Sequence, residues 1–260
     1  MPWEGDWIVD HDKKQVTPTA AGSGVDTQSE AIRRTLEKAR DEKTFKVLSG
    51  WRNELYPIHG YPAGQISIER SGSPLFGINS YGVHMTAYVN GPEGIRIWVP
   101  RRTRTKQTYG GMLDNTVAGG ISIGEKPLEC VVREAAEEAS FPEELVRTKA
   151  KACGTVSYFH IRDERAGGEV GLLQPECQYC YDMEVGPDIV PKPCDGEVEE
   201  FYLWTVEKVQ KALAEGQFKP NCAVVVLDFL VRHGVVTAEN DKDYVEIVSR
   251  LHRKLPFPTV

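Results

Sequence analysis

Residues 119–141 read GGISIGEKPLECVVREAAEEASF, which combines two glycines, an isolated glutamate and an acidic cluster. A helix over this cluster places Glu134, Glu137 and Glu138 at positions i, i+3 and i+4, so that three carboxylates share one face. Like charges at this spacing repel one another, and no lysine is interleaved with them as on an ordinary solvated helical surface. The spacing therefore favours a site for a hard divalent cation, Mg²⁺ or Mn²⁺.

Residues around the acidic cluster add further elements of the same predicted site. Gly119 and Gly120 precede the helix, where the backbone approaches a ligand closely and a carbonyl oxygen can join a metal shell. Arg133 lies four residues before Glu137 and is expected to orient that carboxylate by a charge-assisted hydrogen bond. A basic run that follows a predicted strand is expected either to clamp a phosphate group or to form a solvated loop. Its charged residues are Arg101, Arg102, Arg104 and Lys106.

The composition limits the class of protein. The 260 residues fit one large domain or a domain with a smaller appendage. The 31 basic and 38 acidic residues give a net charge of −7, which does not favour non-specific binding of nucleic acid. No apolar run is long enough to cross a bilayer, and the first residues lack the order of a secretory signal. A cytosolic or organelle-matrix protein is therefore expected, and the cytoplasm is the predicted location.

The six cysteines are scattered, which suits reduced thiols better than a disulfide framework. Cys177 and Cys180 form a CxxC spacing inside PECQYCYDMEV, an alternating pattern that predicts a strand. Residues three apart on a strand face opposite sides, so these two sulfur atoms are expected to diverge. The spacing is therefore interpreted as structural rather than as a zinc site.

The order of predicted elements indicates an α+β protein with two parts. Residues 1–75 are expected to form a small α+β lead segment, in which 1–25 are flexible and Asp26 caps a helix. Residues 76–260 contain the remaining strands and three C-terminal helices, without a regular βαβ alternation. This order predicts a mixed sheet with helices on its faces. The expected strands cover 83–89, 94–100, 116–123, 153–161, 175–185 and 197–205, and the expected helices cover 127–139, 205–216, 221–234 and 243–255.

The quoted stretch resembles the Nudix box, whose pattern is G-x5-E-x7-R-E-U-x-E-E-x-G-U, with U a bulky aliphatic residue. Phe141 takes the last hydrophobic place, whereas Ala135 is a small version of U and Ser140 replaces the glycine that ends the helix. A non-glycine residue in the left-handed conformation at that place costs about 1 kcal/mol and lies away from the carboxylates. The matching positions are Gly119, Glu125, Arg133, Glu134, Glu137 and Glu138.

This resemblance implies the Nudix fold, an α/β/α sandwich around a mixed sheet, and metal-assisted hydrolysis of a small-molecule diphosphate. The three glutamates of the cluster would hold Mg²⁺ or Mn²⁺, and the carbonyl of Gly119 would join them. A carboxylate must then take the proton from the attacking water. Glu137 and Glu197 are both candidates for this role, and the family does not decide between them.

A narrower resemblance extends over most of residues 50–235. Segments such as RTKQTYGGMLDNTVAGGI and WRNELYPI look like a Nudix subgroup of fungi and plants, which also occurs fused to fungal thiamine pyrophosphokinases. That subgroup is associated with removal of phosphate from damaged thiamine diphosphate, in the oxothiamine and oxythiamine forms. Asp114 and Asn115 precede the box and are expected either to contact such a heterocycle or to form a turn. Five aromatic residues are candidates for stacking on it: Tyr109, Tyr158, Phe159, Tyr179 and Trp204.

Other functions occur on the same fold. An isopentenyl diphosphate isomerase needs a cysteine just before the box, where this chain has LDNTVAGG. A non-catalytic binding domain is expected to lose metal carboxylates, and all three are present. RNA decapping favours a more basic surface. Hydrolysis of ADP-ribose or NADH stays open as the principal alternative.

Overall fold

The fold is built on a six-stranded mixed sheet. The computed structural model describes residues 5–19, 23–61 and 64–259. Five strands follow the order β10-β6-β5-β9-β8, and β7 pairs with β5 beside β6. β5 and β9 are parallel and the other pairs are antiparallel, so the predicted mixed sheet is confirmed. The strands are β5 (Ser80–Gly91), β6 (Gly94–Arg102), β7 (Val117–Gly120), β8 (Ala150–Ile161), β9 (Leu173–Glu184) and β10 (Val198–Thr205).

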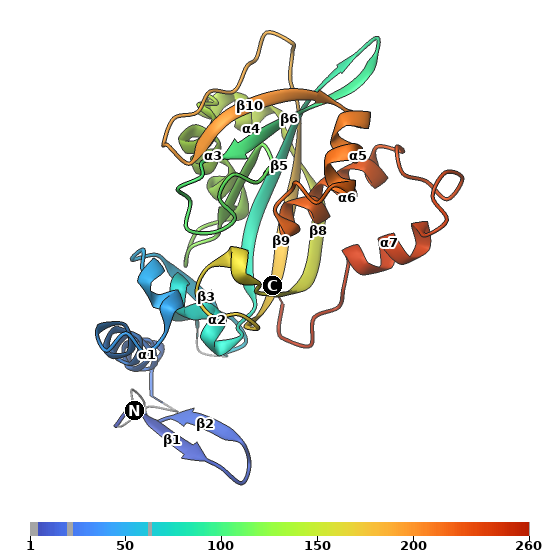
Figure 1. The fold of residues 1–260 in the computed structure, drawn as a ribbon. Coiled ribbons are helices and arrows are strands. Elements are labelled where there is room, and N and C mark those ends of the chain that lie inside the picture. The colour runs from blue at the N-terminus through green and yellow to red at the C-terminus, as the bar shows by residue number, and fades with distance from the viewer. Residues whose placement is uncertain (1–4, 20–22, 62–63, 260) are drawn as a thin grey trace.

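Helices cover both faces of this sheet, as Figure 1 shows. The helices α3 (Pro127–Ala139) and α4 (Glu143–Lys149) share one apolar core with alternate residues of β5 and β9. The helices α5 (Val206–Ala214) and α6 (Pro220–Arg232) share another core with β6, and α7 (Tyr244–Leu251) lies beside α6 and β8. Alternation of apolar side chains along the strands supplies both cores, which gives the expected α/β/α sandwich.

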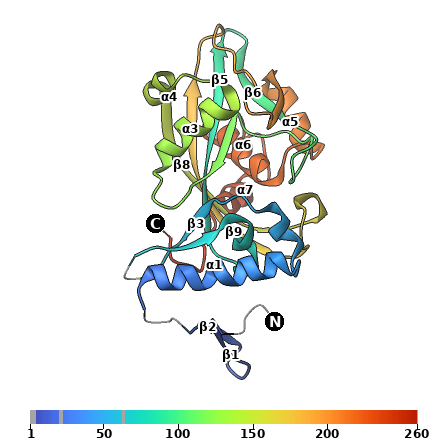
Figure 2. The ribbon, with the colours of Figure 1, turned by 90° about the vertical axis from the view of Figure 1, so that its left-hand side faces the viewer.

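A smaller α+β unit precedes the sandwich and lies at one end of it (Figure 2). Its core joins the long helix to a short hairpin through residues that include Leu36, Leu48 and Ile68. The helix begins at Val25 after Gly24, so the prediction that Asp26 caps it is wrong by two residues. The elements are α1 (Val25–Asp41), η1 (Lys46–Gly50), β3 (Leu55–Ile58), β4 (Ile66–Glu69), η2 (Arg70–Gly72) and α2 (Ser73–Phe76).

The segment before α1 contains an antiparallel ribbon of β1 (Trp7–Asp10) and β2 (Gln15–Pro18). The indole nitrogen of Trp7 donates to Thr35 Oγ1 over 2.6 Å, which attaches the ribbon to α1. This differs from the flexible lead-in expected for residues 1–25, of which 1–4 and 20–22 lie outside the described residues. Two four-residue strands give little periodicity to detect in a sequence.

The two units are interlocked by backbone and side-chain contacts. The Ile123 backbone N–H donates to the Leu55 carbonyl over 2.8 Å, so β3 is joined to the loop that follows β7. The C-terminal tail returns along β8, where Arg253 N donates to the Ser157 carbonyl and Phe257 lies 5.9 Å from Phe159 between ring centroids. Any site between the units is therefore framed by several elements at once.

Two sequence expectations concern single features. Cys177 belongs to the core under α3 and Cys180 to the opposite face near α6, so their predicted divergence on β9 is confirmed. Among the described residues, no helix combines the length and the apolar composition that crossing a bilayer requires.

Candidate active site

The acidic helix α3 has the bounds that the sequence predicts. It begins at Pro127, whose fixed φ suits the first helical turn, and it ends at Ser140 in the left-handed conformation with φ 55° and ψ 29°. Val131 and Ala135 are fully buried against the sheet. The opposite side of α3 therefore carries the glutamates toward the edge of β7.

Glu134 lies directly over Gly119. A Cβ atom added at Gly119 would overlap the carboxylate of Glu134, so only glycine leaves room for this side chain. Burial raises the pKa of Glu134 to about 7, although the neighbouring Arg133 guanidinium acts in the opposite direction. A second positive charge beside Glu134 would restore its ionised form.

Glu138 is more deeply buried, with 8% of its surface exposed. Its Oε2 atom accepts a hydrogen bond of 3.0 Å from the Ala118 backbone N–H, which ties α3 to β7. Burial raises the pKa of Glu138 well above its ordinary value, and the nearby Glu134 carboxylate raises it further. The nearby positive charge is thus insufficient to offset the burial of these two carboxylates.

Arg133 holds the carboxylates of the helix in place. Its Nη1 atom lies 2.8 Å from Glu134 Oε1 and 3.1 Å from Glu137 Oε2, so the expected contact with Glu137 is confirmed. Its Nε atom lies 2.9 Å from Glu125 Oε1, and Glu125 in turn accepts from the Ser122 backbone N–H over 3.2 Å. Glu125 is therefore a support of the arginine rather than a part of the cluster.

The chemistry of the donor set fits a divalent cation. Within the described ranges, no three acidic, histidine or cysteine side chains converge as the ligands of a metal do. Glu137 is turned toward Arg133 and its side chain is 53% exposed. The oxygen donors, the burial that raises the pKa of both Glu134 and Glu138, and the glycine beneath Glu134 all suit Mg²⁺ or Mn²⁺.

A cavity of about 400 Å³ opens beside this edge, between the two units. Gly119 and Gly120 lie in its wall, and the N-terminal unit contributes Arg52, Tyr56 and Arg70 opposite them. A Cβ atom at Gly120 would overlap the hydroxyl of Tyr56, so the units meet in close contact there. The loop after β8 closes another side, because Glu169 accepts from the Lys46 and Val47 backbone N–H groups over 2.5 and 3.0 Å.

Comparison with known families divides the chain close to the start of β5. The NUDIX domain matches residues 81–222, which is more than half of the chain, and contains the acidic helix, the glycines and the whole sheet. The chain belongs to the Nudix family. A domain of unknown function, DUF4743, matches residues 8–80, which include the elements that form the opposite wall of the cavity. The boundary expected near residue 75 lies close to this division.

Three curated relatives match most of this chain, and two of them are named Nudix hydrolases. "Uncharacterized protein YJR142W" of Saccharomyces cerevisiae is 39% identical over 90% of this chain and 70% of its own length. "Nudix hydrolase 20, chloroplastic" and "Nudix hydrolase 24, chloroplastic" of Arabidopsis thaliana are 37% and 36% identical over 80% and 79% of this chain. The chain spans 54% of each plant protein. Family and plant relatives together indicate a hydrolase of pyrophosphate bonds, a class that uses divalent metals.

The basic run before the Nudix box does not line the cavity. Arg101 donates to the Gly111 carbonyl over 2.8 Å and Arg104 is exposed to solvent. Arg102 is buried in an ion pair with Asp114, its Nη1 atom lying 2.5 Å from Asp114 Oδ2. These contacts fix a turn rather than present a clamp to the Nudix site.

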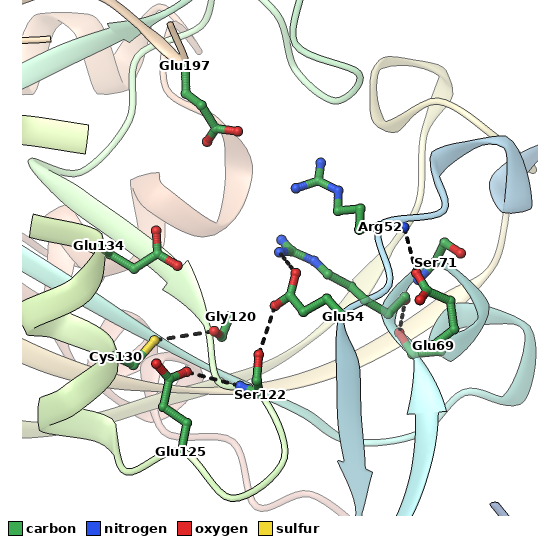
Figure 3. Close-up of polar contacts among 12 residues, drawn as sticks. Arg52, Glu54, Glu69, Ser71, Gly120, Ser122, Glu125, Cys130, Glu134 and Glu197 are labelled. Atoms are coloured by element: carbon green, nitrogen blue, oxygen red, sulfur yellow. Dashed lines mark hydrogen bonds and ion pairs between the residues drawn. The ribbon is translucent and has the colours of Figure 1, made fainter. Parts of the chain in front are cut away.

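Lys106, Asn115 and Glu197 also have partners within the protein. Lys106 forms an ion pair with Glu197, and Asn115 is buried with its Oδ1 atom 2.7 Å from His84 Nδ1. Neither Lys106 nor Asn115 belongs to the cavity wall. Figure 3 shows that Glu197 and Glu134 point into the same open region, which Arg52 enters from the other side. Glu197 is thus placed beside the Nudix box despite its distance in sequence.

The structure adds Arg52 and Arg70, which the sequence analysis did not select. Arg52 makes no ion pair within the described residues, whereas Arg70 lies 2.8 Å from Glu54 Oε2. Both arginines come from the N-terminal unit, which contacts the Nudix domain through the bond between β3 and the loop after β7 and through Tyr56. No local pattern around either residue indicates this, since the contact is tertiary.

The Arg102–Asp114 pair makes a prediction about stability. Arg102→Met is expected to lower the free energy of unfolding by about 3 kcal/mol, because it leaves a buried carboxylate without its cation. Urea unfolding measures this change, and Arg104→Met serves as the exposed control from the same run. A variant of unchanged stability and strongly raised KM would instead return Arg102 to the role of a phosphate ligand.

Proposed function

We propose that this chain hydrolyses a small-molecule diphosphate with Mg²⁺ or Mn²⁺ at the edge formed by Gly119, Glu134 and Glu138. The observation that supports this most directly is the cavity whose wall contains Gly119, the glycine beneath Glu134, together with Arg52 and Arg70. Arg52 and Arg70 carry the positive charge that a diphosphate needs on the side opposite the carboxylates. The small negative net charge of −7 agrees with a small-molecule substrate rather than nucleic acid.

The residues of the Nudix box have different roles in this proposal. Glu134, Glu137 and Glu138, with the Gly119 carbonyl, would hold the divalent cation. When bound, such a cation polarises phosphoryl oxygens and lowers the pKa of an attacking water. Arg133 keeps Glu134 and Glu137 in position through its two short contacts.

A carboxylate must accept the proton of the attacking water, and two remain candidates. Glu137 is exposed at the end of the Arg133 network. Burial alone would raise the pKa of Glu197, but the Lys106 ammonium and the more distant Arg52 outweigh it and lower that pKa. Glu197 is therefore ionised at neutral pH and oriented by Lys106, although its basicity is reduced.

The finer part of the proposal names oxidised or otherwise damaged thiamine diphosphates, the oxothiamine and oxythiamine forms, as substrates, with the monophosphate and phosphate as products. The resemblance of segments in residues 50–235 supports this choice, and the cavity has the size of a small-molecule site. ADP-ribose and NADH are the alternatives. The cytoplasmic location expected from the sequence stays a prediction.

Parallel assays test the substrate. Phosphate release with Mg²⁺ is measured from oxothiamine, oxythiamine and thiamine diphosphates, and monophosphate products are measured from ADP-ribose and NADH. A clear preference for an oxidised thiamine compound supports the proposal. A preference for a dinucleotide keeps the reaction class and rejects the thiamine assignment, whereas no turnover of any compound contradicts the proposed function.

Arg52 provides a test of the cavity wall. Arg52→Ala is expected to raise KM by about tenfold with a smaller change in kcat, because one charged contact to the diphosphate is lost. Steady-state kinetics on the preferred substrate measure both constants. Arg33→Ala is the matched control, since Arg33 lies on α1 outside the cavity and pairs only with exposed glutamates of its own helix. Equal effects of the two changes would contradict a role for Arg52.

A further inference from the structure

The charges around the cavity are strongly uneven. Positive side chains come from both units, and among the described lining residues Glu176 is the one acidic side chain. Such a carboxylate would ordinarily pair with one of its cationic neighbours. The cationic lining residues are Lys46, Arg52, Arg70, Arg162 and Lys219.

Glu176 is held instead by neutral donors. The Tyr158 hydroxyl donates to Glu176 Oε2 over 2.6 Å, and Gln178 Nε2 donates to the same oxygen over 3.1 Å. Gln174 Nε2 makes a longer contact of 3.4 Å with Glu176 Oε1. Burial raises the pKa of Tyr158 well above its ordinary value, and the Glu176 carboxylate adds to this, so the phenol stays a donor.

Arg162, an arginine of the cavity wall, donates to groups other than Glu176. Arg162 Nη1 donates to Gln174 Oε1 over 2.9 Å, and its Nη2 atom donates to the carbonyls of Ala166 and Gly167 over 2.7 and 2.8 Å. Across residues 5–19, 23–61 and 64–259, no ion pair includes Glu176. A carboxylate accepts about four hydrogen bonds, so three neutral donors leave acceptor capacity facing the cavity.

The sheet places Glu176 at a defined distance from the metal edge. Gly82 pairs with Gly120 on β7 and with Gln178 on β9, and Glu176 lies two residues along β9 on the same face as Gln178. Two strand spacings across and two residues along give a separation on the order of 10 Å between Glu176 and Gly120. That separation accommodates a diphosphate at one end and a ring at the other.

We propose that Glu176 recognises the organic part of the substrate by accepting a hydrogen bond from an amino group on a nitrogen heterocycle. This inference rests on the proposed function, because it assumes that the diphosphate lies at the Gly119 edge. Gln174, Gln178 and Tyr158 are positioning residues that orient the carboxylate. Among the damaged thiamine diphosphates, oxothiamine diphosphate keeps the pyrimidine amino group, whereas oxythiamine diphosphate carries a ring carbonyl in its place, so the inference narrows the proposed substrates to the oxothiamine form.

The test compares ligands that differ at this group alone. One pair is oxothiamine diphosphate and its deaminated analogue, in which a ring carbonyl replaces the pyrimidine amino group, and the other is ADP-ribose and its hypoxanthine analogue. Dissociation constants are measured by calorimetry with Ca²⁺ in place of Mg²⁺, and kcat and KM are measured with Mg²⁺. Within the pair that it binds, the wild-type chain is expected to prefer the amino member on the order of 10- to 100-fold.

Three variants assign this preference to Glu176. Glu176→Gln is expected to remove the preference for the amino member, because the amide can donate a hydrogen bond to the ring carbonyl of the other member. The change is expected in KM and in the dissociation constant, with kcat nearly constant. Glu176→Asp keeps the charge and is expected to retain part of the preference. Glu184→Gln makes the same chemical change at the far end of β9, next to Tyr88, and is expected to leave the preference unchanged. The ratio of the two dissociation constants within a pair is insensitive to partial unfolding, because unfolding lowers the amount of protein that binds either member equally.

The outcomes separate the two proposals. Equal treatment of both members by the wild-type chain, or a preference that survives Glu176→Gln, overturns the role of Glu176 and leaves the proposed hydrolysis standing. Selective binding of the amino compounds without turnover supports the role of Glu176 and contradicts the hydrolysis. Failure to bind any of the four compounds contradicts both proposals.

Discussion

Replacing Glu138 by glutamine is expected to lower kcat for phosphate release on the order of 10³-fold. Glutamine keeps an oxygen that accepts from the Ala118 backbone N–H, so the join between α3 and β7 survives the change. What disappears is one negative charge at a cation site that already depends on few buried carboxylates. The fold is expected to be as stable as before or more so, because burial disfavours the charged form of Glu138.

Kinetics, Mg²⁺ titration and thermal unfolding together check this expectation. Glu129→Gln is the matched control, because Glu129 lies on the same helix, is exposed and pairs with Arg147 over 2.6 Å. It is expected to change kcat little. Undiminished turnover in Glu138→Gln would reject the metal-site assignment, and a lowered melting temperature would show that the carboxylate serves the fold instead.

Gly119→Ala is expected to lower kcat/KM on the order of 10²- to 10³-fold, because the added methyl group occupies the space of the Glu134 carboxylate. The overlap involves Oε1, Cδ and Cγ of Glu134, so a small rotation of the carboxylate does not relieve it. The side chain must leave its position over β7, and Arg133 loses one of its three partners. The strand itself tolerates alanine, since the φ of Gly119 is not positive.

Gly91→Ala provides the control for this change. Gly91 also lies in a strand without positive φ, and a Cβ atom there meets nothing within 4 Å. It is expected to leave activity and stability nearly unchanged. If Gly119→Ala behaved in the same way, the position of Glu134 over Gly119 would have no part in the reaction.

The sequence predicts the parts of this site that local geometry determines. The bounds of α3, the shared face of its glutamates and the contact of Arg133 with Glu137 all follow from spacing along one helix. The resemblance to the Nudix box extends this to Gly119, whose neighbour Glu134 lies on another element. These features need no knowledge of the chain beyond residues 119–141.

The remainder of the site depends on contacts that no local pattern encodes. Arg102 belongs to the basic run that could clamp a phosphate group, yet it is buried in an ion pair with Asp114. Arg52 and Arg70 have no distinctive sequence context and line the cavity because several contacts, among them the bond from Ile123 to Leu55, join the two units. Charge patterns identify candidate ligands, and tertiary packing decides which of them face the substrate.

The contact between Tyr56 and Gly120 has a consequence for the history of the chain. The two residues belong to segments that match different domain families, yet neither surface accepts a larger neighbour without a change in the other. If recombination joined this Nudix domain to an unrelated N-terminal segment, the domain would lose the residues that form one wall of its cavity. We therefore expect the two segments to be inherited together, with substitutions at these two positions correlated across descendants.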